Sequence, residues 1–201
     1  MSESSLDNNL TNKRESLDKK SEDLELIERT LSGDKNAFSN IVERYETKVR
    51  GYCYLMLRDK TSAEDAAQEI FLKAYRALSK FNHKSTFSTW LYSISSNHCI
   101  DTLRKEKVKR LLSFNFSLVS PLSVLPDSVS SSIEGKEMLL KVLHGLSPEY
   151  RSLLIMSEAE DLTLKEMAEA FHTSIDSIKS KLKRAKKRAL EIKKSIENEE
   201  R

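Results

Sequence analysis

Several features of strand-rich and secreted proteins are scarce in this sequence. Its 201 residues include only 4 glycines, 3 prolines and 2 cysteines. Glycine and proline usually mark tight turns and the ends of strands, so their shortage argues against a strand-rich fold. Helical periodicities are found through most of the chain. Cys53 and Cys99 are too few and too distant in sequence for a disulfide framework, so we expect two reduced thiols.

Long hydrophobic runs are also missing. No apolar stretch is long enough to cross a bilayer, and the N-terminal segment lacks the apolar core of a signal peptide. We therefore expect a cytoplasmic protein with no direct membrane insertion.

Signatures of enzymes are equally absent. The sequence has no Gly-rich phosphate loop and no GxSxG elbow. His98 lies beside Cys99, and His83 and Cys53 lie elsewhere, but no CxxC or HxxxH spacing supports a zinc site. We expect no catalytic residues, no metal, no cofactor and no small-molecule substrate.

The composition favours two small helical domains over one large globule. The hydrophobic share of 38% is low for a single compact domain, and the charged share of 32% is high. We predict an all-α fold with a disordered tail over residues 1–22, a first domain over 23–107, a flexible linker over 108–134 and a second domain over 135–196. The stretch from Leu111 to Pro126 is apolar and uncharged, so we expect it to pack between the domains or against a partner.

In the first domain we predict four helices. The first is a short helix from Asp23, and the second is capped by Asp34. The third begins at Ser62, where Asp65 completes a reciprocal cap, and the fourth begins at about Thr86. Acidic residues near the start of the third helix have two interpretations. They suit the helix dipole, and they equally suit a surface that docks a basic partner.

Residues 80–85 interrupt the helical pattern and are followed by an aromatic-rich helix. Most aromatic residues of this domain are expected in its core. A loop with Phe81, Asn82 and His83, close to Trp90 and Asn97, is also typical of single-strand binding, where rings stack on bases and amides read base edges.

The second domain carries a predicted helix-turn-helix. A capping box of Thr163 and Glu166 opens its first helix, and residues 172–174 form the turn. The next helix has one apolar stripe beginning at Ile175, and nine basic residues against two acidic ones between Asp176 and Ser195. This charge favours phosphate contact, although a solvated helix, a coiled coil or a membrane-surface segment shows the same pattern.

Three stretches carry a resemblance to a known family: AEDAAQEIFLKAYRAL (63–78), FSTWLYSISSNHCIDTLRK (87–105), and LSPEYRSLLIMSEAEDLTLKEMAEAF continuing to SIKSKLKRAKKRAL (146–190). In order and spacing they resemble the small two-domain sigma factors of bacterial RNA polymerase, the extracytoplasmic-function (ECF) group. The resemblance implies an alternative sigma factor that binds core RNA polymerase and promoter DNA, directs DNA melting and initiation, and is regulated by an anti-sigma factor.

The resemblance also implies roles for individual residues. The polymerase-binding positions are Asp65, Gln68, Glu69 and Phe71. The minus-10 DNA-binding positions are Phe81, Asn82, His83, Lys84, Trp90 and Asn97. The minus-35 DNA-binding positions are Lys179, Ser180, Lys181, Lys183 and Arg184.

Three positions depart from the family pattern. His172 replaces the usual glycine of the turn, and Lys181 and Lys183 replace the usual arginine or aromatic residue, which shifts minus-35 recognition toward phosphate and shape. Two other functions compete with the sigma-factor prediction. One is a polymerase-independent helix-turn-helix regulator, and the other is an interaction protein that sequesters a partner.

Overall fold

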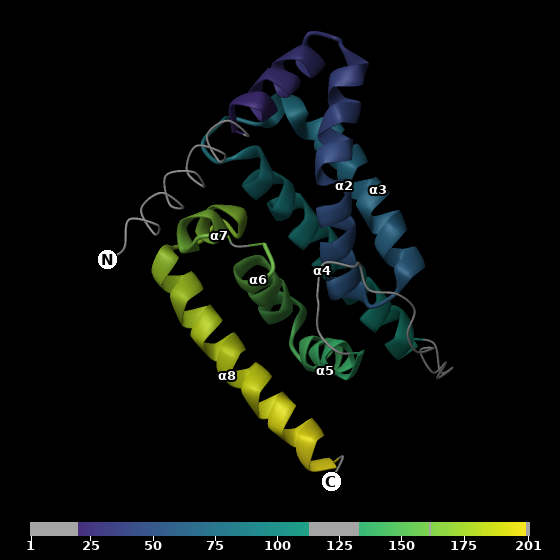
Figure 1. The fold of residues 1–201 in the computed structure, drawn as a ribbon, viewed down its shortest axis with the longest axis vertical. Helices are drawn as coiled ribbons and strands as arrows, with labels where there is room; N and C mark the ends of the chain where they lie inside the picture. Colours follow the sequence, from purple (N-terminus) through teal and green to yellow (C-terminus); the bar gives the residue numbers. More distant parts are fainter. Residues whose placement is uncertain (1–19, 113–132, 161, 200–201) are drawn as a thin grey trace.

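A computed structural model describes residues 20–112, 133–160 and 162–199. The ordered structure in these ranges is helical and contains no strand, which confirms the predicted all-α fold. After the helical residues 20–31 come, in chain order, α2 (Lys35–Leu57), α3 (Lys60–Ala77), the short 3-10 helix η1 (Leu78–Lys80), α4 (Phe87–Leu112), α5 (Ile133–His144), α6 (Pro148–Glu158), α7 (Leu164–Ala170) and α8 (Ile175–Glu199) (Figure 1).

The boundaries of the predicted tail and linker shift slightly. Residues 20–22, assigned to a disordered tail, are helical, and the rest of that tail lies outside the described residues. α4 continues to Leu112 and α5 begins at Ile133, so both ends of the predicted linker are helical. The remainder of the apolar stretch to Pro126 also lies outside the described residues.

In the first domain, α2 packs against both α3 and α4. The predicted cap of α2 is confirmed, because the Asp34 carboxylate accepts hydrogen bonds from the backbone N–H groups of Asn36 and Ala37. The predicted start of α3 at Ser62 is wrong. α2 ends in the left-handed residue Arg58, and Asp59 then caps α3 by accepting from the Ser62 N–H at 2.7 Å.

A buried carboxylate attaches the N-terminal helical residues to α2. Asp23 is only 4% exposed, and it accepts hydrogen bonds from the Tyr45 hydroxyl at 2.5 Å and from Arg44 at 2.7 Å. Burial, together with this bond to Asp23, raises the pKa of Tyr45, so the phenol stays protonated. The contact orients residues 20–31 across one end of the helical layer.

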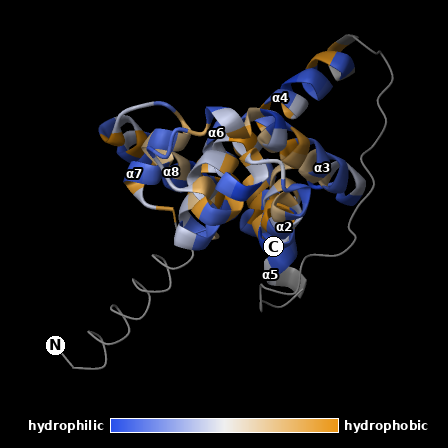
Figure 2. Cartoon of the chain, turned by 90° about the horizontal axis from the view of Figure 1, so that it is seen from above, coloured by the Kyte–Doolittle hydropathy of each residue, from blue (hydrophilic) through white to orange (hydrophobic). Residues whose placement is uncertain are grey.

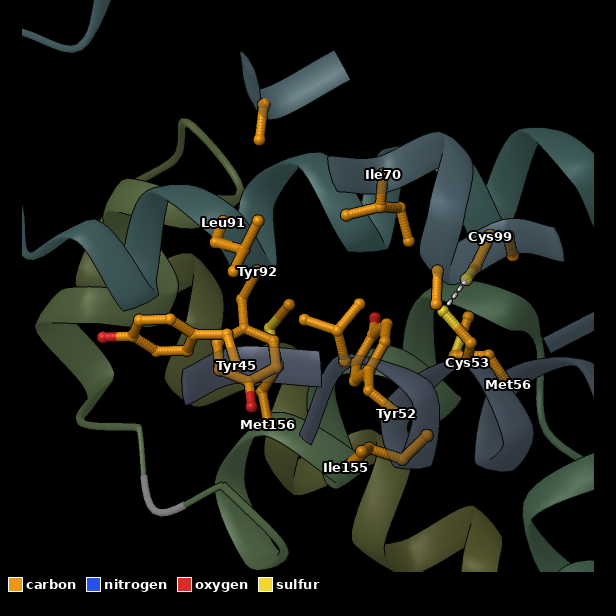
Figure 3. Close-up of a cluster of buried hydrophobic side chains, with 14 of the residues drawn as sticks. Tyr45, Tyr52, Cys53, Met56, Ile70, Leu91, Tyr92, Cys99, Ile155 and Met156 are labelled. Atoms are coloured by element: carbon orange, nitrogen blue, oxygen red, sulfur yellow. Dashed lines mark hydrogen bonds between the residues drawn. The ribbon is translucent and has the colours of Figure 1, made fainter. Parts of the chain in front are cut away.

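The two cysteines lie side by side in the core. Both are free and buried, and the Sγ atoms of Cys53 and Cys99 are 3.8 Å apart (Figure 3). The prediction of unpaired thiols is therefore confirmed, but the spatial proximity was not foreseen, because the residues come from α2 and α4.

In the second domain, the predicted caps of two helices are confirmed. The Ser147 hydroxyl accepts from the Tyr150 N–H with Pro148 in the first turn of α6, and Thr163 with Glu166 forms a complete capping box on α7. Gly145 allows α8 to approach the turn before α6, because a Cβ atom at this position would lie 3.0 Å from Ile192 Cδ1.

The cores of the two domains are continuous. α5, α6 and α7 pack on α2 and α4, and buried side chains from both halves form one hydrophobic cluster. Figure 3 shows Ile155 and Met156 of α6 beside Tyr45 and Tyr52 of α2. Figure 2 shows hydrophobic residues concentrated where the helices face each other, while the C-terminal end of α4 projects from the body.

None of the described helices combines the length and apolar character needed to span a bilayer.

Candidate functional site

A groove runs along the outer surfaces of α2 and α3. Its volume is about 800 Å³, and it is lined by Lys35, Phe38, Val42, Glu46, Arg50, Glu64, Ala67, Gln68, Phe71, Leu72 and Tyr75. Leu72 and Tyr75 are 47% and 45% exposed, so they present adjoining apolar surface to solvent along the groove. The Tyr75 ring rests edge-on against Phe38 with the centroids 4.9 Å apart.

The predicted polymerase-binding residues lie in or next to this groove. Gln68 and Phe71 line it, with Phe71 buried at only 7% exposure. Asp65 and Glu69 are exposed on the same helix, although they are not among the lining residues. The groove is mainly apolar, its lining includes charged residues of both signs, and the carboxylates of Asp65 and Glu69 lie beside it. This arrangement suits an amphipathic partner with basic residues on the side of Asp65 and Glu69.

The predicted minus-10 loop divides into a buried anchor and an exposed tip. Phe81 is 7% exposed and packs against Trp90, Phe87 and His83 at ring-centroid distances of 5.4, 5.9 and 4.8 Å. Its ring is therefore not free to stack on a base in this conformation, as the loop hypothesis had assumed. Phe87 and Trp90, at the start of α4, pack against the Phe81 ring and hold it in the core.

The tip of the loop points its polar groups outward. Asn82, His83 and Lys84 are exposed, and the Asn82 side-chain oxygen accepts a hydrogen bond from the Lys84 N–H at 3.2 Å. His83 adopts a left-handed backbone with φ of 58°. This local turn presents an amide, an imidazole and an ammonium group together.

Along α4, Trp90 is partly buried and Asn97 is exposed. A basic pair that the motif reasoning had not assigned to DNA lies next to Asn97. The Lys73 Nζ and the His98 Nδ1 are 2.6 Å apart. Partial burial, with the charge of Lys73, lowers the pKa of His98, so the neutral imidazole accepts from the ammonium group.

This pair was missed because its members are 25 residues apart, on α3 and α4, and form no sequence motif. His98 had been considered with Cys99 as a possible zinc ligand. Within the described ranges, no group of three or more His, Cys, Asp or Glu side chains is placed to hold a metal ion.

The predicted helix-turn-helix is present as α7, the turn and α8. The Phe171 N–H bonds back to the end of α7, His172 has a φ of 50°, and the Ser174 hydroxyl accepts from the Ser177 N–H at 3.2 Å at the start of α8. The position that usually carries glycine was expected to have a left-handed backbone, and His172 has one. Ile175 departs from the predicted apolar stripe, because it is 41% exposed at the first residue of α8.

α8 buries one stripe and leaves its basic face outside. Ile178, Leu182 and Ala185 are buried. Four of the five predicted minus-35 residues are therefore exposed: Lys179, Ser180, Lys183 and Arg184. Lys181 is only partly exposed, because its Nζ lies 2.6 Å from a carboxylate oxygen of Glu149 in α6.

Other ion pairs on α8 leave its charge largely available. Lys179 with Asp176, Lys186 with Glu158, and Arg188 with Glu191 are surface pairs at 3.7, 2.8 and 3.1 Å. Such pairs contribute little net energy and are easily exchanged for phosphate contacts.

Comparison with known families matches both halves of the chain. Residues 41–108 match sigma-70 region 2, and residues 136–188 match sigma-70, region 4. The first range contains the loop, most of α4 and the groove lining apart from Lys35 and Phe38, and the second contains the helix-turn-helix up to Arg188 of α8.

Curated relatives match the chain over most of its length. An ECF RNA polymerase sigma factor, SigW of Bacillus subtilis, is 31% identical over 80% of this chain and 90% of the relative. The ECF RNA polymerase sigma-E factor of Escherichia coli is 30% identical over 80% of this chain and 88% of the relative.

Solved structures share the fold. The sigma factor RpoE from Bartonella quintana, in complex with the anti-sigma factor NepR, has a TM-score of 0.65 and 23% identity, covering 78% of this chain and 96% of that one. CnrH, in complex with the cytosolic domain of CnrY, also has a TM-score of 0.65, with 19% identity over 87% of this chain and 98% of that one. On the sequence matches and the two consecutive sigma-70 regions, the chain belongs to the ECF group of RNA polymerase sigma factors.

Proposed function

We propose that this sigma factor docks on core RNA polymerase through the groove between α2 and α3, and that it contacts the two promoter elements through its two domains. The observation that carries this proposal is the exposure of three separate surfaces at the positions expected from the family. They are the groove, the loop 82–84 with α4, and the basic face of α8.

The groove supports docking of an amphipathic helical partner. Leu72 and Tyr75 offer apolar contact area, and burying it on a partner is favourable by about 25 cal/mol per Å². Asp65 and Glu69 would attract basic residues that flank the apolar face of that partner. In this role Phe71 supports the floor of the groove and makes no charged contact.

The first domain supports capture of the minus-10 element. Asn82, His83 and Lys84 would contact bases that have left the stack, with Asn97 and the exposed part of Trp90 along the same strand. Phe81 fixes the loop from inside the core. Lys73 and His98 extend this surface as phosphate contacts.

The second domain supports minus-35 binding. α8 would enter the major groove with Lys179, Ser180, Lys183 and Arg184 facing DNA, and Lys181 would join them by leaving Glu149. Because lysine makes less directional base contacts than bidentate arginine, phosphate contacts are expected to supply much of the affinity.

An anti-sigma factor is the proposed regulatory partner. Two solved structures with the same fold are complexes, one of the sigma factor RpoE with the anti-sigma factor NepR and one of CnrH with the cytosolic domain of CnrY. By analogy, a protein that covers the α2/α3 groove of this chain would block polymerase docking.

The docking surface is tested by co-purification with core RNA polymerase. The variant Asp65→Lys/Glu69→Lys reverses two exposed charges beside the groove, whereas the control Glu25→Lys/Glu28→Lys reverses two exposed charges on the N-terminal helical residues. We expect the control to bind like the wild type and the groove variant to lose most of its binding. Equal binding of core polymerase by both variants would show that the docking surface lies outside this groove.

The function itself is tested by transcription of genomic DNA in vitro. Core polymerase with the purified chain should produce transcripts whose start sites share two upstream elements, and Lys183→Ala/Arg184→Ala should reduce their yield. If no transcripts appear but the chain alone binds duplex sites tightly, it would be a stand-alone regulator. Polymerase binding without transcription would indicate a sequestering protein.

A further inference from the structure

The two cysteines of the chain form a buried pair that the proposed function does not use. Cys53 of α2 and Cys99 of α4 are both 0% exposed, and their Sγ atoms lie 3.8 Å apart in a hydrogen bond (Figure 3). Neither residue lines the groove, and neither is a predicted DNA-binding position. The chain contains no other cysteine, so any thiol chemistry of this protein takes place at this pair.

The surroundings of the pair favour a covalent bond over a metal ion. Met56 and Ile70 belong to the same buried hydrophobic cluster, and Figure 3 shows Met56 beside Cys53. Among the described residues, no His, Asp or Glu side chain joins the two cysteines as a third metal ligand. Two thiols in an apolar setting, without further ligands, suit a disulfide better than the four-coordinate site that zinc requires.

In the folded chain the reduced pair reacts slowly with oxidants. The hydrogen bond between the two thiols, together with burial, raises the pKa of Cys53, so this thiol stays protonated at neutral pH. The thiolate is the species that reacts, and burial also keeps oxidants away from the sulfur atoms. Oxidation therefore requires a transient local opening of the first domain, of the kind that folded domains undergo spontaneously.

Once one thiol has reacted, its neighbour is in place to complete a disulfide. A hydroperoxide transfers one oxygen atom to the first thiol, which becomes a sulfenic acid as the O–O bond breaks and an alcohol or water leaves. When the domain recloses, the second thiol attacks the sulfenic sulfur, and water leaves as the S–S bond forms. For this bond the sulfur atoms approach by only about 1.8 Å, from 3.8 Å to the usual distance of about 2.05 Å.

The bond would constrain the segment that carries parts of two proposed surfaces. Residues 54–98 lie between the cysteines and contain α3, the loop 82–84 and the first half of α4. Linking residues 46 positions apart restricts the unfolded chain, which stabilises the folded domain, and the small adjustment of the two helices offsets part of this gain. Because both cysteines are buried, the bond leaves the exposed residues of these surfaces accessible.

We propose that Cys53 and Cys99 are a redox-sensitive modification site, at which a hydroperoxide forms a reversible disulfide that holds α2 against α4. The reduced pair is the resting state. The oxidised chain resists unfolding more strongly than the reduced chain, so the first domain stays folded when oxidants are present. A dithiol reductant restores both thiols by thiol–disulfide exchange. This inference does not depend on the proposed function.

Treatment of the wild-type chain with hydrogen peroxide provides the first test, because it needs no substitution. The treated chain is unfolded, its free thiols are alkylated with iodoacetamide, and its peptides are mapped by mass spectrometry. We expect most chains to show Cys53 joined to Cys99 and no alkylated cysteine, with both thiols recovered by dithiothreitol. Two alkylated cysteines, a sulfinic acid in place of the bond, or a bond between separate chains would each overturn the proposal.

Thermal unfolding measures the effect of the bond on stability. The oxidised wild-type chain should melt about 5 °C or more above the same chain after reduction. Cys53→Ala and Cys99→Ala are matched controls, since each removes one sulfur atom of the pair, and peroxide should not raise the melting temperature of either. A wild-type chain that melts no higher when oxidised, or controls that gain as much from peroxide, would overturn the stabilising role of the disulfide.

The requirement for local opening has a separate test. Urea at concentrations below the unfolding midpoint increases the population of open states, so it should speed disulfide formation in the wild-type chain several-fold. The reaction of free cysteine with peroxide in the same solutions serves as the control for effects of urea on the chemistry. A rate of disulfide formation that follows this control at every urea concentration would overturn the opening step.

Discussion

The Tyr52 hydroxyl and the Ser152 hydroxyl lie 2.6 Å apart in a hydrogen bond that links residues 100 positions apart in sequence. Both residues are fully buried, and the Ser96 hydroxyl makes a second bond to Ser152. The three hydroxyls satisfy one another where water does not reach. Because Ser152 belongs to α6, the hydroxyls of Tyr52 in α2 and Ser96 in α4 reach it only across the contact between the two domains.

Removing Ser152 from this network should destabilise the chain. Ser152→Ala leaves two buried hydroxyls, those of Tyr52 and Ser96, without their shared partner, at a cost of about 1–3 kcal/mol. Adding Tyr52→Phe to Ser152→Ala removes one orphaned group, so the combined loss should be about 1 kcal/mol smaller than the sum of the single losses. Urea unfolding of the four chains in the cycle measures this coupling. Additive losses would show that the two hydroxyls act independently.

Stability should fall in mild acid because of His144. Burial, followed by the charges of Arg151 and Arg58, lowers the pKa of this imidazole from 6.5 to about 3, although a backbone hydrogen bond to Leu55 favours its protonation. Its Nε2 is buried without a hydrogen-bond partner among the described residues. A group with a depressed folded-state pKa contributes stability above its unfolded value of 6.5 and loses it as pH falls toward 3.

The expected loss between pH 7.5 and pH 5.5 is about 1.4 kcal/mol from this group alone. The apolar variant His144→Met should lose correspondingly less over the same interval, as measured by urea unfolding at both pH values. His83→Gln, which removes an exposed histidine, serves as the control and should behave like the wild type. An unchanged pH dependence in His144→Met would assign the acid sensitivity to other groups.

Local features of the fold were predictable because their causes are local. The caps at Asp34, Ser147 and Thr163 depend on a side chain and N–H groups two or three residues away. The left-handed backbone at His172 follows from a turn that usually contains glycine. These signals lie within single stretches of sequence.

Contacts between segments that are distant in sequence could not be predicted from local patterns. Nothing near Arg151 in sequence indicates that its guanidinium reaches the Met56 carbonyl 95 residues earlier. The Lys73 and His98 pair also needs two helices to meet. Phe81 was predicted as a base-stacking residue, but three neighbouring rings bury it, because a small domain uses the aromatic groups that lie closest to its core.

Lys181 should become more available for DNA when its carboxylate partner is removed. In the free chain its Nζ lies 2.6 Å from Glu149, so DNA binding has to break this ion pair. Glu149→Gln should increase affinity for duplex DNA a few-fold at low salt, because one competing charge is lost and a further counterion can be released. Fluorescence anisotropy over a salt series measures both effects.

A matched comparison identifies the cause of that change. Glu158→Gln removes the partner of Lys186, which is not among the predicted minus-35 residues. It should change affinity less than Glu149→Gln does. Equal effects from both variants would indicate a general charge effect, with no specific role for Lys181.

The turn of the helix-turn-helix stores strain that glycine should relieve. His172 is exposed and has a φ of 50°, a region in which a side chain costs roughly 1–2 kcal/mol for most residues and less for histidine. His172→Gly should raise the melting temperature by about 2–4 °C if it stabilises the chain by 1 kcal/mol. His172→Val should lower it, because a β-branched side chain tolerates this backbone least. Neither change touches the predicted DNA-binding residues of α8, so DNA affinity at low temperature should stay at the wild-type level. A lower melting temperature in the glycine variant would show that the imidazole stabilises the turn by more than its backbone strain costs.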